Sequence, residues 1–318
     1  MASYTEINIQ DVERILSLYN LCNVSHVIPR NLGISNSNYQ VIYGDGKSVL
    51  LKVSNDKNVA QLKEEMEILT TLKNLNYPYS LTPFPLLKGG YVYEVENYFG
   101  VVFPFINGHP PRIDNMSCFA IGKALAQLHL ASEHKTLPHH LRSYHDVGCD
   151  SVGILEYIKT HPLCPSHFKQ AFFEVFPQGR EPFEKITFPQ GIIHGDLYYD
   201  NTLFDEAHLQ VVAVLDFEQA GVGEFIFDIG VSISGSCLKN GLVDVNLTKE
   251  FLKGYNSLRK LSLEETSFLN EAILIGLFSI ALWRIKRFKE GNLDPTRSES
   301  YLELVNRALS FKKQQFSL

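Results

Sequence analysis

The sequence predicts an α+β fold made of two lobes, the first containing most of the strands and the second mainly helical. Up to about Pro104, several segments alternate apolar and polar residues on either side of short turns, which is typical of half-buried strands. From Asn115 onward, apolar residues recur mostly at helical spacing. We therefore expect an N-terminal lobe over residues 1–105 and a larger C-terminal lobe over residues 106–318.

Length and composition exclude several classes of protein. The chain has 318 residues, 45% hydrophobic and 20% charged, so it can bury a large core and is not expected to be disordered. A net charge of -6 without a long basic run disfavours binding to nucleic acid or to an anionic membrane. Five scattered cysteines, no signal-like start and no apolar run of membrane-spanning length lead us to expect a cytoplasmic protein without disulfides.

In the N-terminal lobe, two helices are expected to accompany four strands. The clearest signal is the turn Gly44-Asp45-Gly46 between two alternating runs, which predicts a hairpin with Lys52 on its second strand. The last two strands should join at a turn near residues 97–100. The expected elements are a helix over 9–20, the hairpin over 38–53, a helix over 58–75 and two strands within 91–106.

The C-terminal lobe is helical except for residues 191–220, which are expected to run as strand, polar loop, short strand, turn and strand. The turn is expected at Asp205-Glu206-Ala207-His208. Helical spacing predicts further helices over 115–134, 151–158, 168–176, 228–234, 247–255 and the apolar segment that ends near Phe288.

Three polar side chains in and after the central loop suggest phosphoryl transfer. Asp196 lies in the tripeptide HGD, Asn201 follows five positions later, and Asp216 lies twenty positions after Asp196. Phosphoryl transfer from a nucleotide needs an acidic group beside the attacking hydroxyl and oxygen ligands for magnesium. Asp196 and Asn201, one loop apart, can face the same phosphates, while Asp216 follows the next strand and can ligate metal from the other side.

Nucleotide phosphates also need a positive charge, and Lys52 on its predicted strand can supply it. The helix that follows carries Glu64, Glu65 and Glu67, and one of these carboxylates could pair with the lysine and hold its ammonium group in place. The spacing alone leaves open which of the three does so.

Together, these motifs resemble the superfamily of aminoglycoside phosphotransferases, choline kinases and homoserine kinases, whose fold is like that of protein kinases. The resemblance covers nearly the whole chain. It rests most strongly on IIHGDLYYDNTLF and VLDFEQAGVGEFIFDIGVSI, with weaker support from IGKALAQLH, VLLKVS and GISNSNYQV.

The resemblance implies a two-lobed, protein-kinase-like fold and an enzyme that uses ATP and magnesium to phosphorylate a hydroxyl group of a small molecule. Asp228 would hold the catalytic loop, and the backbone of residues 103–106 would pair with adenine. The remaining roles that it implies are Asp196 as catalytic base, Asn201 and Asp216 as magnesium ligands, Lys52 on the phosphates, Glu65 as its partner, and Ser35, Asn36, Pro104 and Ile106 around the nucleotide.

Within the superfamily, the chain looks most similar to the choline-kinase-related type of homoserine kinase, which would place it in threonine biosynthesis. The similar segments are YTEINIQDVERILSLYNL, GISNSNY and GYNSLRKLSLEE. The residues themselves also favour an amino-acid acceptor. Arg284 and Arg287 lie three positions apart beside Trp283, which predicts that both lie on one face of a helix. A guanidinium there could bind the carboxylate of an amino acid through two hydrogen bonds.

Other acceptors and one other class of protein stay open. Aminoglycoside and choline or ethanolamine acceptors would leave the chemistry unchanged, while a kinase fold without catalysis would serve as a binding module. Glu218 stands where protein kinases have the glycine of DFG, and no long activation segment separates Asp216 from Asp228, which favours a small-molecule acceptor over a protein. The sequence does not indicate an oligomeric state.

Overall fold

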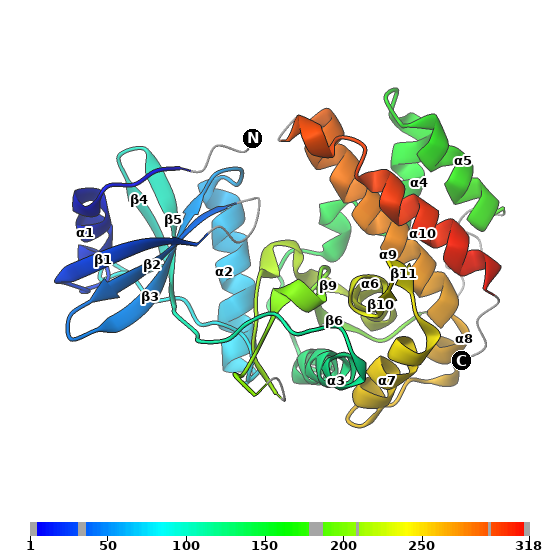
Figure 1. The fold of residues 1–318 in the computed structure, drawn as a ribbon, viewed down its shortest axis with the longest axis horizontal. Coiled ribbons are helices and arrows are strands. Elements are labelled where there is room, and N and C mark those ends of the chain that lie inside the picture. The colour runs from blue at the N-terminus through cyan, green and yellow to red at the C-terminus, as the bar shows by residue number, and fades with distance from the viewer. Residues whose placement is uncertain (1–4, 31–35, 178–186, 208–209, 292–293, 315–318) are drawn as a thin grey trace. The chain divides into compact units, whose positions relative to one another are not determined.

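The computed structural model describes residues 5–30, 36–177, 187–207, 210–291 and 294–314 (Figure 1). The chain divides into two units, Met1–Asn74 with Ser80–Asn107 and Leu75–Tyr79 with Gly108–Leu318. The first unit holds an antiparallel sheet and the second is mainly helical, so the predicted α+β class is confirmed. That Leu75–Tyr79 belongs to the second unit was not predicted; there the Tyr77 hydroxyl donates to the carbonyl of Ala124 over 3.4 Å.

The first unit is built on a five-stranded antiparallel sheet of order β1-β2-β3-β5-β4. Its centre is the predicted hairpin, paired from Asn36 opposite Ser54 to Tyr43 opposite Lys47. β1 was not predicted, because none of its residues is buried and its sequence does not alternate. The strands are β1 Val24–Arg30, β2 Asn36–Tyr43, β3 Lys47–Ser54, β4 Val92–Val95 and β5 Tyr98–Pro104, so the last turn lies at 96–97, slightly before the predicted position.

Two helices cover the two faces of this sheet. α1 (Ile9–Ser17) packs its apolar side against one face, in a core cluster that includes Leu51 and Val53 of β3. Successive side chains of a strand point to opposite faces, so Lys52 points to the other face. α2 (Val59–Asn74) lies there and brings its buried Glu65 to Lys52. The predicted hairpin therefore presents the lysine toward the predicted acidic helix.

The second unit is organised around α6 (Phe225–Ser236), all twelve residues of which are buried. α6 packs against α9, α3 packs against α7, and α10 lies along α9 (Figure 1). α6 begins at Phe225 and not at Asp228 as predicted, because the chain enters the helix directly from β9 through three buried apolar residues. The other helices are α3 Asn115–Ser132, α4 Ser151–Thr160, α5 Ser166–Val175, α7 Val245–Asn256, α8 Leu263–Ser267, α9 Leu269–Arg284 and α10 Tyr301–Lys313.

Short strand pairs carry the loops of the second unit. β6 (Gln190–Ile193) pairs with β9 (Gly221–Glu224), β7 (Thr202–Phe204) with β8 (Val211–Val214), and β10 (Leu238–Lys239) with β11 (Leu242–Val243). β6, β7 and β8 match the predicted strands of residues 191–220. β9 was missed, since two glycines interrupt its apolar pattern, and the predicted turn at 205–208 lies partly outside the described residues.

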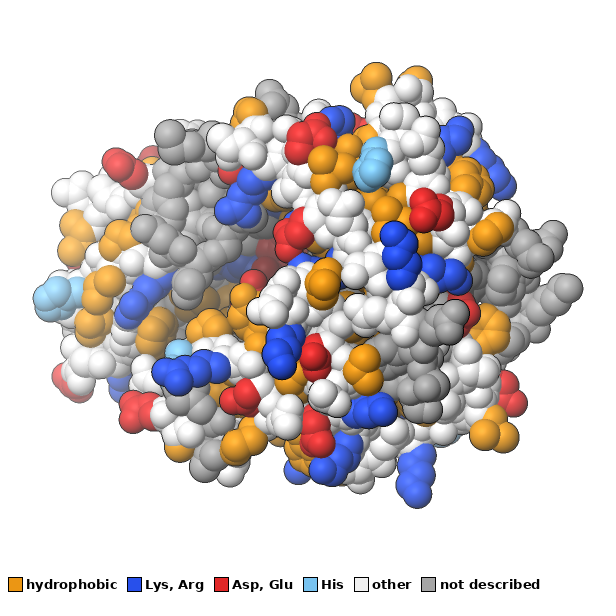
Figure 2. Space-filling model, turned by 45° about the vertical axis from the view of Figure 1, so that its right-hand side comes forward, with side chains coloured by type: hydrophobic (Ala, Val, Ile, Leu, Met, Phe, Trp, Pro, Cys, Tyr) orange, Lys and Arg blue, Asp and Glu red, His pale blue; other side chains and the backbone are white. Residues whose placement is uncertain are grey.

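Among the described residues, no helix combines the length and apolar character needed to cross a membrane. On the face shown in Figure 2, lysine and arginine side chains are interspersed with aspartate and glutamate. The described side chains of that face therefore form no extended patch of one sign, in keeping with the nearly balanced counts of basic and acidic residues.

Candidate active site

The loop after β6 carries Asp196 and is held in place by hydrogen bonds to Asp228 of α6. One carboxylate oxygen of Asp228 accepts the backbone N–H of His194 and the other accepts that of Gly195, both over 2.8 Å. This confirms the expectation that Asp228 holds the loop. Gly195 has a φ of 75°, and a Cβ there would lie 2.4 Å from the ring of Tyr144, so both the backbone and the packing require glycine.

Asn201 lies beside Asp196 as the spacing predicted. Its side-chain N–H donates to the backbone carbonyl of Asp196 over 2.8 Å, which leaves the amide oxygen as a possible metal ligand. The backbone N–H of Leu215 donates to the carbonyl of Asn201 over 2.8 Å, and His194 Nε2 donates to the carbonyl of Leu215 over 2.8 Å. The loop of Asp196 and Asn201 is thus joined to the residue that precedes Asp216.

Asp216 adopts a left-handed backbone conformation, with φ 63° and ψ 59°. The turn that follows is fixed by Arg142, whose Nε donates to the carbonyl of Ala220 over 2.5 Å and whose second nitrogen donates to the carbonyl of Glu218. Arg142 was not predicted as part of this site, since a single arginine in an irregular segment carries no pattern. It holds in place the loop that presents Asp216.

The electrostatics of this cluster fit a bound cation. Removal from water raises the pKa of Asp196 well above its usual range, and the negative charges of Asp216, Asp200 and Glu218 raise it further, while Arg284 acts in the opposite direction. Several carboxylates sharing one site repel each other unless a positive charge joins them. The oxygens of Asn201 and Asp216 suit magnesium, which usually takes one or two carboxylates together with substrate phosphates.

No group of three or more histidine, cysteine or acidic side chains within the described ranges is arranged as a metal cage.

In the first unit, Glu65 is the acidic residue of α2 that meets Lys52. Its Oε1 lies 4.0 Å from Lys52 Nζ and its Oε2 lies 2.9 Å from Lys57 Nζ. Glu65 is 2% exposed, whereas Glu64 and Glu67 lie on the exposed side of the helix. Lys57 was not foreseen as a second partner, since it lies in the connection between β3 and α2.

The other residues expected around the nucleotide lie at the edges of the same unit. Asn36 is buried at the start of β2, and Pro104 ends β5 opposite Val49, with Ile106 partly buried just beyond it. Ser35 lies outside the described residues. Their roles toward a nucleotide stay predictions.

The proposed substrate arginines are not equivalent. α9 ends at Arg284, and residues Ile285–Glu290 form a π-helix, so Arg284 and Arg287 do not share the continuous α-helical face that their spacing predicted. Arg287 packs its guanidinium over the Trp283 ring at 4.8 Å. Arg284 donates to the Ser300 carbonyl over 2.9 Å, pairs with Glu303 at 3.1 Å, and is near enough to favour the charged forms of Asp196 and Asp200.

Tyr198 is a further residue of this site that sequence reasoning did not single out. Its hydroxyl lies 3.2 Å from Ser234 Oγ on α6, and the charges of Asp196 and Arg284 both act on it. Gly235 makes room for its ring, because a Cβ there would lie 2.1 Å from a ring carbon. Tyr198 therefore joins the loop that carries Asp196 to α6.

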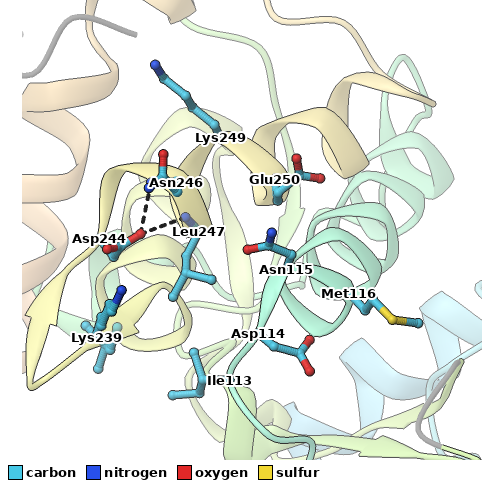
Figure 3. Close-up of a pocket in the computed structure, with 11 residues that line it drawn as sticks. Ile113, Asp114, Asn115, Met116, Lys239, Asp244, Asn246, Leu247, Lys249 and Glu250 are labelled. Atoms are coloured by element: carbon cyan, nitrogen blue, oxygen red, sulfur yellow. Dashed lines mark hydrogen bonds between the residues drawn. The ribbon is translucent and has the colours of Figure 1, made fainter.

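A separate pocket of about 820 Å³ opens between the N-terminal ends of α3 and α7 (Figure 3). Asp244 caps α7 there by accepting the backbone N–H groups of Asn246 and Leu247, and Asp114 caps α3. The lining of this pocket contains none of the predicted site residues.

Comparison with known proteins shows the family to which this chain belongs. The model of the phosphotransferase enzyme family APH matches residues 26–261, and the chain belongs to this family. The homoserine kinase of Methylobacillus glycogenes is 24% identical over 100% of this chain and 99% of its own length.

Two solved structures share the fold of this chain. A microcompartment-associated aminopropanol kinase has a TM-score of 0.68 at 19% identity and covers 96% of this chain and 95% of its own. The amicoumacin kinase hAmiN, solved in complex with AMP-PNP, Ca²⁺ and Ami, has a TM-score of 0.70 at 15% identity and covers 97% of this chain and 94% of its own. At these identities the two structures show the fold, and the family match over residues 26–261 shows the class of activity, a phosphotransferase.

Proposed function

We propose that this protein is a homoserine kinase that uses ATP and magnesium to phosphorylate the side-chain hydroxyl of L-homoserine in the cytoplasm, as a step of threonine biosynthesis. The observation that carries the choice of acceptor is the position of Arg284. Its charge acts on Asp196, the proposed base. Its guanidinium pairs with the carboxylate of Glu303 at 3.1 Å, and the carboxylate of homoserine would take the place of Glu303 there. Full-length similarity to a homoserine kinase supports the same acceptor.

In the proposed reaction, Asp196 orients the acceptor hydroxyl and takes its proton. The hydroxyl oxygen forms a bond to the terminal phosphorus of ATP, and the bond from that phosphorus to the leaving ADP breaks. Asn201 and Asp216 would hold magnesium, which, when bound, offsets the negative charge on the phosphoryl oxygens. Asp228 and Arg142 keep the two loops in the required conformation through the contacts with Gly195 and Ala220.

In the first unit, we propose that Lys52 contacts the nucleotide phosphates while Glu65 holds its ammonium group. Glu65 now shares its carboxylate between Lys52 and Lys57, so the lysine is partly oriented before a nucleotide binds. Ser35 and Asn36 would lie over the phosphates, and the backbone from Pro104 to Ile106 would pair with adenine. The complete set of Lys52, Asp196, Asn201 and Asp216 argues against a kinase fold that only binds.

A comparison of two acceptors tests the proposed carboxylate site directly. 3-Amino-1-propanol is homoserine without its carboxylate, so it keeps the amino group and the hydroxyl at the same spacing. Arg284→Ala should raise the KM for homoserine on the order of tenfold or more and leave the KM for 3-amino-1-propanol nearly unchanged. An equal effect on both acceptors, or on neither, would rule out Arg284 as the carboxylate ligand.

A further inference from the structure

A chain of hydrogen bonds in the second unit ends at the loop that carries Asp196. Arg259 donates to the Tyr255 hydroxyl over 3.2 Å, and that hydroxyl lies 2.7 Å from His129 Nδ1. His129 Nε2 lies 3.0 Å from an oxygen of Asp228, which also accepts the backbone N–H of His194 over 2.8 Å. This series of hydrogen bonds links α7, α3 and α6 to the loop that carries Asp196, the proposed catalytic loop.

We propose that Tyr255 and Arg259 are positioning residues of the phosphotransfer reaction, which act by holding the ring of His129 in place so that its Nε2 donates to Asp228. This inference rests on the proposed kinase activity. Neither residue touches the reacting groups in our account. They act through His129 on Asp228, and Asp228 acts on the backbone of the loop.

The donor and acceptor groups of these four residues fix the direction of every hydrogen bond in the series. An ionised carboxylate only accepts hydrogen bonds, so Nε2 of His129 must carry the proton that faces Asp228. Nδ1 of the neutral ring is then an acceptor, and the Tyr255 hydroxyl donates to it. The oxygen of Tyr255 in turn accepts from Arg259, which has no acceptor of its own.

Because the network is buried, each of these hydrogen bonds must be made within the protein. The side chains of His129 and Asp228 are 0% exposed, so water cannot replace a missing partner. Burial lowers the pKa of His129 against the opposing effect of Asp228, which keeps the ring neutral near pH 7. The ring also stacks on Phe225 at 4.3 Å with a 12° interplanar angle, so its plane is fixed as well as its proton.

Arg259 is itself held in one place by buried acids. Its Nε lies 3.0 Å from Glu133 and its NH1 lies 2.9 Å from Glu265, which is 1% exposed. Glu265 also closes the capping box of α8 with Ser262. The segment between α7 and α8 thereby reaches the catalytic loop through a single buried network.

Without the donor at Tyr255, Nδ1 of the buried ring loses its hydrogen bond, while the proton stays on Nε2 facing Asp228. The ring is then free to turn within its stacked plane, which would weaken the hydrogen bond from Nε2 to Asp228. Asp228 would shift, and the N–H groups of His194 and Gly195 that it holds would follow. We therefore expect a lower kcat with little change in either KM, because the loop position matters in the transition state more than in substrate binding.

Tyr255→Phe tests the proposal, since it removes only the hydroxyl and keeps the ring. Arg259→Ala is less informative, because it leaves Glu265 buried without its partner and is expected to unfold the protein. The matched control is Tyr19→Phe, which also removes one buried hydroxyl, in that case a donor to the Tyr91 carbonyl over 2.7 Å in the core of the first unit.

Two measurements are made on the full chain at pH 7.5. The first is the ¹⁵N chemical shift of the His129 ring nitrogens, assigned by comparison with His129→Gln. The second is kcat with magnesium, ATP and the best available acceptor, or the slow ATP hydrolysis rate if no acceptor is known. Failure of homoserine as acceptor would therefore not affect the test.

We expect all three proteins, wild type, Tyr19→Phe and Tyr255→Phe, to keep the proton on Nε2, and only Tyr255→Phe to show a shifted Nδ1 resonance and a kcat that is lower on the order of tenfold. Two outcomes would overturn the proposal. One is an unchanged ring spectrum in Tyr255→Phe, and the other is a kcat equal to that of Tyr19→Phe despite the altered Nδ1 resonance.

Discussion

The side-chain amide of Asn201 donates to the backbone carbonyl of Asp196 over 2.8 Å. The proposed metal ligand thus fixes the peptide of the proposed base, and one side chain serves both parts of the reaction. The amide nitrogen is committed to this contact, so the amide oxygen is the atom that can reach magnesium.

Asn201→Asp should lower turnover about 10- to 100-fold and raise the magnesium concentration needed for half-maximal rate. The new carboxylate would face the Asp196 carbonyl without a proton to donate and would add charge to an already acidic cluster. ADP release measured against magnesium concentration checks this. Asn246→Asp makes the same exchange at an exposed position in the first turn of α7 and should behave like wild type.

Glu65→Gln should raise the KM for ATP about tenfold and lower the free energy of unfolding by about 1–3 kcal/mol. Lys52 and Lys57 would both lose their charged partner, which now lies 4.0 and 2.9 Å away. Initial rates and urea unfolding give the two quantities. Glu67→Gln, on the exposed face of the same helix, is the control, and an equal KM shift in that variant would contradict the assignment of Glu65.

The free energy of unfolding should decrease as the pH falls below about 6.5, the ordinary pKa of histidine, because the folded state lowers the pKa of His129. The unfolded chain then binds a proton that the folded chain does not, and the loss continues until the pH reaches the lower, folded pKa. The lowered pKa of Asp228 acts in the same direction below pH 3.8. Urea unfolding at pH 8 to 5 measures the slope. His129→Gln should flatten it, and an unchanged slope would contradict this account.

Gly235→Ala should destabilise the second unit by about 1–3 kcal/mol and reduce turnover, because its methyl group would overlap the Tyr198 ring. A Cβ at Gly235 would lie only 2.1 Å from that ring. Thermal unfolding of the single variants and of Gly235→Ala with Tyr198→Ala tests the contact. If the double variant loses as much stability as the two single changes combined, the two residues do not interact as described.

The parts of the fold that the sequence predicted are those with strong local patterns. The hairpin around Gly44-Asp45-Gly46 and the buried helix α9 were recognisable, because alternation and helical spacing report directly on burial. β1 and β9 were missed, since an exposed edge strand and a glycine-interrupted strand carry no such pattern.

The same distinction applies to the site. Asp196, Asn201 and Asp216 stand in a motif of fixed spacing, whereas Arg142 and Tyr255 reach the catalytic loops only through tertiary contacts. The π-helix after Arg284 also has no sequence signal, so the predicted common face of Arg284 and Arg287 was wrong.

The central claim is that Asp196 serves a kinase whose acceptor is homoserine. The most direct measurement is magnesium-dependent ADP release from ATP with L-homoserine, choline, ethanolamine, kanamycin, methylthioribose or 3-amino-1-propanol, with Asp196→Ala as the blank. We predict that homoserine gives the highest kcat/KM and that the blank, while still binding ATP, loses at least about 100-fold in rate. Preference for another acceptor would contradict the homoserine assignment, and undiminished turnover in Asp196→Ala would contradict the assignment of the base.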